Sequence, residues 1–173
     1  MNSLWQRMIR ASKLEVNLYE EVEADTTATS QAMLVVILSS LAAGIASLGD
    51  AGIGGLIWGT LGALVGWFVW AYLTYLIGTR VLPEPQTEAD VGQLLRTIGF
   101  SSAPGVIRIF GIIPLFRQFF FFLAGLWMLV AMIIAVRQAL DYRSTGRAVI
   151  VCLIGWLAQV IVLWLFMALF VRP

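Results

Sequence analysis

The fold is decided by one apolar run, from Ile53 to Leu82, which reads IGGLIWGTLGALVGWFVWAYLTYLIGTRVL. Four glycines in it are separated by 4, 3 and 4 residues, a spacing that places them on one flank of a helix. They are Gly55, Gly59, Gly62 and Gly66. Because lipid gives apolar helices no hydrophobic reason to associate, close approach along small residues is a main packing device in membranes. The spacing predicts a helix-packing stripe, directed either at other helices of the chain or, through a GxxxG pair, at a second copy.

The composition indicates a membrane protein that lacks the usual catalytic residues. Of the 173 residues, 60% are hydrophobic and 12% are charged, and the mean hydropathy is +0.90; soluble domains are about 45–50% apolar and about 25% charged. The net charge of +1 argues against nucleic-acid binding. The chain has no histidine, the commonest general base and metal ligand, and all ten acids lie outside the apolar spans. We expect no enzymatic activity, no cofactor and no metal.

The apolar runs predict an all-α membrane protein, a bundle of five transmembrane helices behind an N-terminal interfacial and cytoplasmic segment, residues 1–30. The expected spans are about 29–48, 53–82, 101–116, 118–137 and 147–171. The third is short or broken, so its core, Ala103–Phe116, either crosses or re-enters. With Arg108 set aside, crossing places eight of the Lys and Arg residues inside and two outside, whereas re-entry gives seven and three. The positive-inside rule favours crossing, with a cytoplasmic N-terminus in the cytoplasmic (inner) membrane.

Two amphipathic segments are predicted to lie on the membrane surface. Residues 3–14 carry apolar side chains on one helical face, with Arg7, Arg10 and Lys13 opposite, typical of an interfacial helix whose basic side faces headgroups. Residues 88–98 repeat apolar side chains at i, i+3, i+4 and i+7, which predicts a second such helix.

Three polar side chains are candidate contacts to a lipid or another anion. Arg108 lies within an apolar segment, where it either snorkels or bonds to carbonyls freed near Gly111 and Pro114, or else contacts a lipid phosphate. Arg96, on the predicted surface helix, is expected to anchor at the interface. Gln159, inside the last span, is expected to make an interhelical hydrogen bond, with pore lining as the alternative.

A family resemblance is carried by Gly99, Phe100, Ser101 and Pro104, which stand in the order glycine, aromatic, serine and proline after a glycine-rich span. This order resembles a motif of the Ypt-interacting protein (Yip) family. The acidic stretch from Leu18 to Asp25 looks like prokaryotic members of that family. The resemblance implies five transmembrane helices and a cytoplasmic N-terminus. Eukaryotic relatives bind Rab GTPases and help to shape membranes, but this chain lacks their aspartate-leucine-proline-glycine motif.

These observations favour a non-enzymatic Yip-like membrane protein that organises or scaffolds the membrane. Its expected partners are membrane lipids, with a second copy or other membrane proteins as further partners. The competing hypothesis is a small transporter, channel or lipid-translocating protein in which Arg108 lines the path.

Overall fold

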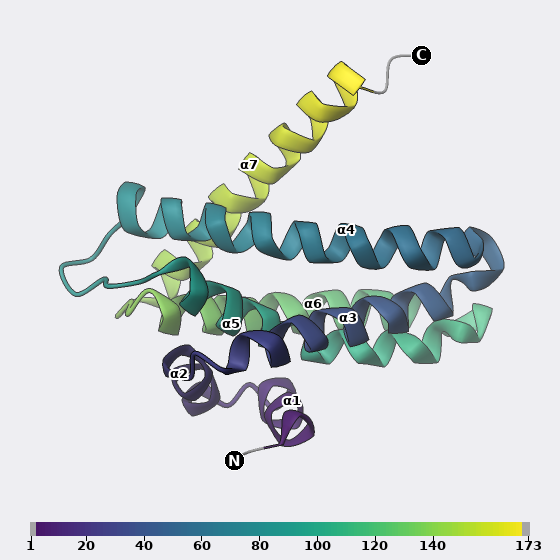
Figure 1. Cartoon of the computed structure of the whole chain (residues 1–173), viewed down its shortest axis with the longest axis horizontal. Coiled ribbons are helices and arrows are strands. Elements are labelled where there is room, and N and C mark those ends of the chain that lie inside the picture. The colour runs from purple at the N-terminus through teal and green to yellow at the C-terminus, as the bar shows by residue number, and fades with distance from the viewer. Residues whose placement is uncertain (1–2, 171–173) are drawn as a thin grey trace.

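The structure, a computed structural model, describes residues 3–170, with side chains described as far as Ile161, and this part of the chain is helical without strands. Its elements are α1 (Leu4–Ser12), α2 (Val16–Ala24), α3 (Ala28–Ala46), α4 (Leu48–Leu76), η1 (Ile77–Val81), α5 (Val91–Ser101), η2 (Ala103–Ile112), α6 (Pro114–Ala139) and α7 (Thr145–Phe170). The long helices α3, α4 and α6 run along a bundle, with α1 and α2 beneath it and α7 leaving on the opposite side (Figure 1).

Three helices are long and apolar enough to cross a membrane: Ala28–Ala46, Leu48–Val81 and Pro114–Ala139. Within the described residues α7 adds a shorter apolar helix, Thr145–Ile161. The second long helix starts earlier than the predicted residue 53, because α4 begins at Leu48. One helical turn there precedes a kink at Gly52, whose φ of 62° is in the left-handed region that glycine adopts readily.

Two ion pairs mark the two ends of the bundle, and the segment between α4 and α6 is not one ordinary helix. At one end, Asp50 in the α3–α4 turn pairs with Arg117 near the start of α6. At the other end, Glu84 after η1 pairs with Arg147 at the start of α7. Elements α5 and η2 connect these two ends in succession (Figure 1). Because η2 is a 3₁₀ helix, rising about 2.0 Å per residue, its ten residues reach further than ten α-helical residues would.

The helix predicted to lie on the surface over residues 88–98 is instead a core element, α5. It begins at Val91, after a capping box in which Asp90 and Gln93 each accept a hydrogen bond from the other's backbone N–H. It contacts α2, α3, α4 and α6, and it buries seven of its eleven residues. The surface prediction is wrong because α2 covers the polar face of α5, including Arg96.

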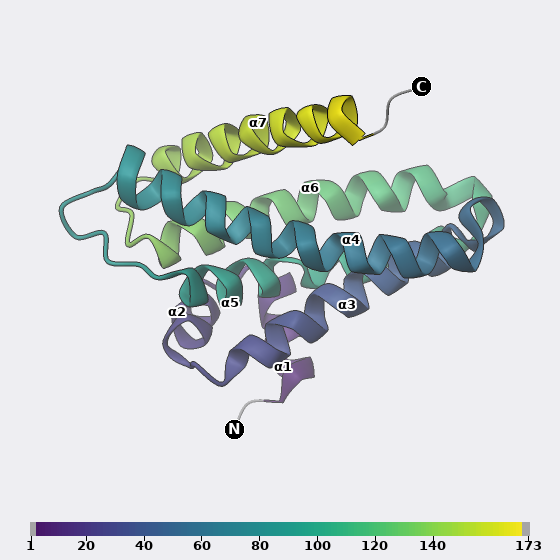
Figure 2. The ribbon, with the colours of Figure 1, turned by 45° about the horizontal axis from the view of Figure 1, so that its top comes forward.

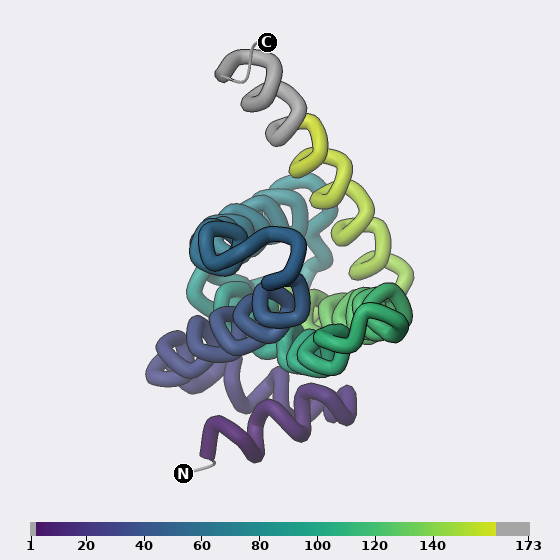
Figure 3. The backbone as a smooth tube through the Cα atoms, turned by 90° about the vertical axis from the view of Figure 1, so that its right-hand side faces the viewer, coloured from purple at the N-terminus to yellow at the C-terminus, as the bar shows by residue number. Residues whose placement is uncertain are grey.

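The α1–α2 pair crosses the flank of the bundle, transverse to the long helices, which Figure 3 shows nearly end-on. Met8 and Ala11 of α1 are buried against the bundle, and the Trp127 indole Nε1 of α6 donates to the Ser12 carbonyl oxygen at 2.8 Å. The buried cluster beneath the pair includes residues of α2, α3, α5 and α6: Leu18, Tyr19, Val22, Val35, Phe100 and Ala135. These contacts fix α1 and α2 to the rest of the fold.

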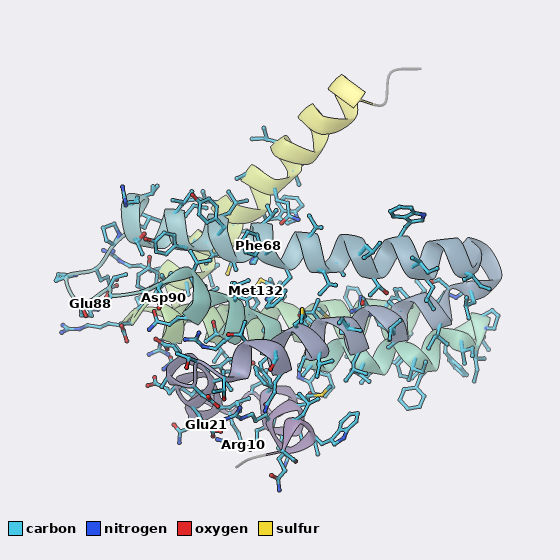
Figure 4. The ribbon with its side chains drawn as sticks, viewed as in Figure 1. Arg10, Glu21, Phe68, Glu88, Asp90 and Met132 are labelled. Atoms are coloured by element: carbon cyan, nitrogen blue, oxygen red, sulfur yellow. The ribbon has the colours of Figure 1, made fainter. Side chains whose placement is uncertain are left out.

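The arginines of α1 face α2 rather than lipid headgroups. Arg7 is almost fully buried and pairs with Glu21 at 3.0 Å and with Asp25 at 2.8 Å. Arg10 lies between Glu15 and Glu21, and Figure 4 shows Arg10 and Glu21 close together at the α1–α2 interface. Acids of the α1–α2 unit therefore pair with two of the three basic residues predicted to face headgroups, while the third, Lys13, is exposed.

Candidate functional site

A cavity of about 990 Å³ lies between α3, α4, α6 and α7. Figure 2 shows α7 lying beside α4 and α6. This volume is at the upper end of the range for small-molecule sites. Its α6 and α7 walls are mainly apolar and include Met128, Met132, Leu153 and Trp156; Met132 lies between α6 and α4 in Figure 4. Leu153 and Trp156 are each more than half exposed, so the cavity opens to the surroundings.

The opposite wall of the cavity carries most of its polar groups. Serine hydroxyl groups from α3 and from the α5–η2 junction line it, and Arg108 of η2 joins them. These serines are Ser39, Ser40, Ser47 and Ser102. Arg108 is the sole charged side chain among the described residues that line the cavity. The cavity is therefore amphipathic, with a polar wall that bears one positive charge and apolar walls facing it.

The glycine stripe of α4 faces this space instead of another helix. Gly55, Gly59 and Gly66 line the cavity. A Cβ atom added at Gly59, Gly62 or Gly66 would meet no neighbouring atom within 4 Å. Within one chain, therefore, these three positions do not make the close helix contact that their spacing predicts. Contact with a second copy stays a prediction.

The glycine stripe is uncovered because α4 contacts its neighbours on either side of it. Near the α3–α4 turn, a Cβ added at Gly44 would stand 3.1 Å from the Leu56 Cγ, so the two backbones approach closely there. Further along, the indole Nε1 of Trp67 donates to the Leu95 carbonyl oxygen of α5 at 2.9 Å. The stripe lies between these two contacts, where no helix fills the space beneath it, and the missing side chains enlarge the cavity.

The residues that carry the family resemblance are packed inside the bundle. A Cβ added at Gly99 would stand 2.7 Å from the Ala32 Cβ, so this glycine lets α5 cross α3 closely. Phe100 and Pro104 are fully buried, and the Ser101 hydroxyl donates to the Ile98 carbonyl oxygen at 2.7 Å. The motif therefore packs the junction between α5 and η2, and its side chains make no contact with the cavity.

Arg108 is held rigidly at the cavity. Its Nε donates to the Gly105 carbonyl oxygen at 3.0 Å, and its Nη2 donates to the Ser39 hydroxyl at 2.7 Å. Its Cζ lies 6.0 Å from the centre of the Phe121 ring, within range of a cation–π contact. No carboxylate among the described residues pairs with it, and its Nη1 makes no hydrogen bond to any of them. The carbonyl oxygens that accept from Arg108 belong to Gly105 and Ser39, not to the predicted region near Gly111 and Pro114.

The other two candidate contacts differ from the predictions. Arg96 is 5% exposed, and its Nε donates to the Val22 carbonyl oxygen at 2.9 Å and to the Glu23 carbonyl oxygen at 3.1 Å. It caps the C-terminus of α2 and is not an interface anchor, because α2 lies over it. Gln159 lines the cavity, and no hydrogen bond joins its side chain to another described residue, so the predicted interhelical bond is absent there.

Two residues that position Arg108 were not predicted. A Cβ added at Gly105 would collide with the Ser39 hydroxyl oxygen, the Arg108 Nη2 and the Met128 sulfur, so only glycine fits between them. Gly105 stands three residues before the arginine, and Ser39 interrupts an apolar span; both are weak signals in a sequence. Among the described residues, no group of three or more His, Cys, Asp or Glu side chains could hold a metal ion.

Comparison with known proteins identifies the family. The family model described as Yip1 domain matches residues 19–167, which include the Gly99–Pro104 motif, η2 and Arg108. Neither the curated proteins nor the solved structures contain a match. Because the matched segment covers most of the 173 residues, this chain belongs to the family of membrane proteins that carry a Yip1 domain.

Proposed function

We propose that this protein is a non-enzymatic, five-span protein of the cytoplasmic membrane that organises the cytoplasmic leaflet. It does so by holding α1 in that leaflet as a wedge parallel to the membrane plane, and by offering its apolar surface to lipids and other membrane proteins. In this arrangement α5 with η2 makes the third crossing, and α1 lies across the flank of the bundle, where Ser12 meets Trp127 about halfway along α6.

The observation that carries this proposal is the position of α1. It lies transverse to the long helices, and Trp5 and Ile9 on its outer side are 61% and 56% exposed. These two residues are one helical turn apart, so they form one apolar edge. On the inner side, Met8 and Ala11 are buried and Arg7 is ion-paired, which prevents α1 from rotating. Trp5 and Ile9 therefore present an apolar edge to the acyl chains beside the bundle.

The distribution of charge supports the cytoplasmic side for this end of the bundle. Four arginines lie near the α6–α7 turn and the loop after η1, while Arg117 lies at the opposite end. The four are Arg80, Arg137, Arg143 and Arg147. Cytoplasmic ends of membrane helices are enriched in such residues. Arg172, which the sequence places on the Arg117 side, lies outside the described residues.

The test is deformation of liposomes by a Trp5→Ser/Ile9→Ser double variant. Vesicles of phosphatidylcholine, with and without an equal part of phosphatidylglycerol, are reconstituted with the full chain and imaged by electron cryomicroscopy. We expect the wild-type protein to narrow the vesicles and the double variant to lose most of this effect. Because Arg7 and Arg10 are already neutralised, the loss should be similar in both lipid mixtures.

The matched control is Trp58→Ser/Leu61→Ser, which removes an exposed tryptophan and an exposed leucine from α4. Its vesicles should resemble those of the wild-type protein. The wedge proposal fails if the α1 variant deforms vesicles normally, or if both double variants lose the effect equally. These point substitutions are cleaner than deleting residues 1–14, which would also strip Glu21 and Asp25 of their arginine partner.

A second candidate function, lipid translocation, is favoured by the rigid Arg108 at the wall of an open cavity. Proteoliposomes with fluorescent lipids in one leaflet would detect it. Transfer that is lost in Arg108→Ala but kept in Arg117→Ala would support translocation, whereas equal transfer in both variants would contradict it.

A further inference from the structure

The cavity wall presents an unused hydrogen-bonding edge with a positive charge. Two of the three guanidinium nitrogens of Arg108 are occupied by Gly105 and Ser39, while Nη1 makes no hydrogen bond to a described residue. An arginine without an acidic partner in a largely apolar bundle is unfavourable, because no carboxylate offsets its charge. The guanidinium is therefore pre-oriented to receive an anion from the cavity, and the fixed geometry lowers the entropic loss on binding.

The remaining walls restrict what that anion can be. The α6 and α7 walls are lined mainly by methionine, leucine and tryptophan, a surface that would favour an acyl chain over a small hydrated ion. No carboxylate stands among the described lining residues. A zwitterionic headgroup would thus bring a cation into the cavity with no anion to receive it. An amphiphile with net negative charge matches both the single arginine and the apolar walls.

We propose that this cavity is a binding site for one acidic phospholipid of the surrounding membrane, whose phosphate lies on the Nη1 edge of Arg108 and whose acyl chains occupy the space under the glycine stripe. Phosphate suits the planar guanidinium because two parallel N–H···O bonds can form. Gly59 and Gly66 leave the room that the acyl chains fill. The site does not depend on α1, so this proposal and the wedge can fail separately.

The glycine stripe supplies a matched pair of variants. Gly59 lines the cavity, whereas Gly62, three residues later on the same helix, does not. Neither would bring an added Cβ within 4 Å of a neighbour. Gly59→Leu therefore fills the cavity, and Gly62→Leu makes the same chemical change outside it. Comparing the two separates occupation of the cavity from any general effect of leucine on α4.

The experiment is native mass spectrometry of the full chain in detergent, titrated with phosphatidylglycerol or with phosphatidylcholine. We expect one bound phosphatidylglycerol, favoured over phosphatidylcholine by about tenfold or more, the scale of a charged hydrogen bond. Arg108→Gln should reduce this preference to near one, and Gly59→Leu should weaken binding of both lipids by about tenfold or more. Arg117→Gln and Gly62→Leu should behave as the wild-type protein does.

Two further titrations identify the source of the anion. Inorganic phosphate should not displace phosphatidylglycerol, and oleate should bind more weakly than phosphatidylglycerol. Displacement by inorganic phosphate would show a free-anion site, and tighter binding of oleate would show a carboxylate site; either result overturns the proposal. It is also overturned if Arg108→Gln keeps the lipid preference, or if Gly59→Leu binds lipid as well as Gly62→Leu does. The glycine pair decides the matter even if Arg108→Gln does not fold.

Discussion

On one side of this bundle a glycine allows two helices to pack closely, and on the other side glycines face open space. In α5, Gly99 admits α3 so closely that an added Cβ would stand 2.7 Å from the Ala32 Cβ, whereas in α4 Gly59 and Gly62 face no neighbour within 4 Å. Both helices lie wholly within the described residues, and α5 buries seven of its 11 residues while α4 buries two of 29. A bare helical flank thus permits close packing without causing it. Whether it is covered depends on the elements at either side.

The two sides also differ in how they treat an arginine. Arg96 on the packed side directs its guanidinium to the Val22 and Glu23 carbonyl oxygens. Arg108 on the hollow side keeps Nη1 without a described partner. The first arginine is a structural cap and the second is positioned for a ligand. Substitutions at matched positions can test this division.

The largest expected effect is at Arg96. Arg96→Met removes the donors that satisfy the C-terminal carbonyls of α2, and we expect the free energy of unfolding to fall by about 2–3 kcal/mol, the range for buried hydrogen bonds to a charged group. Unfolding in mixed micelles, followed by circular dichroism, measures it. The control Arg80→Met changes an exposed arginine in η1 and should stay within about 0.5 kcal/mol. Equal losses would mean that Arg96 is no cap.

The second-largest effect is expected from alanine substitutions at the packed and the open glycines. Gly99→Ala forces α3 and α5 apart, and we expect a loss of about 1–3 kcal/mol, as for other overpacked sites. Gly62→Ala meets open space and gains helix propensity, so it should be neutral or stabilising by up to about 1 kcal/mol. The same micelle unfolding assay compares them. A destabilising Gly62→Ala would indicate that a second copy packs on the stripe, the alternative that its spacing also predicts.

The sequence predicts the long helices well because apolar length is a local property. The runs that begin near residues 29, 118 and 147 start within a few residues of α3, α6 and α7. It does not predict the burial of α5, because the covering contact joins Arg96 to Val22 across 74 residues. Amphipathic spacing indicates one apolar face and cannot show that α2 covers the other.

The candidate site was partly predictable for the same reason. Arg108 stands out because a charge inside an apolar segment is rare, and the structure places it on a cavity wall. The glycine stripe containing Gly59 also stands out in the sequence. It faces a cavity instead of a helix, however, and no sequence pattern predicts a cavity. Ser39 and Gly105 position the arginine through contacts between separate elements, and neither residue type is unusual enough to attract notice.

Tight packing on the α2 side has a consequence that depends on pH. Burial, reinforced by Asp141 and Glu20, raises the pKa of Glu23 from 4.5 to about 7. Between these values the folded protein holds a proton that the unfolded chain releases, so stability is highest below pH 4.5 and falls as the pH rises towards 7. After allowance for partial exposure, we expect a loss of about 1 kcal/mol. Glu23→Gln should remove this slope in micelle unfolding, whereas Glu88→Gln on the exposed loop should retain it.

The smallest effect is expected where the α1–α2 pair meets solvent. The Arg10–Glu15 ion pair is 2.9 Å long, but its two side chains are 26% and 43% exposed, so Glu15→Gln should change the free energy of unfolding by less than about 0.5 kcal/mol. The Arg7–Asp25 pair is more enclosed, since the arginine side chain is 8% exposed, and Asp25→Asn should have the larger effect. Because salt screens exposed pairs far more than enclosed ones, 1 M salt, where the Debye length is about 3 Å, should abolish the first difference and preserve most of the second. Equal salt sensitivity of the two variants would show that solvent reaches Arg7 as freely as Arg10, and that α1 is not clamped in the way a fixed wedge requires.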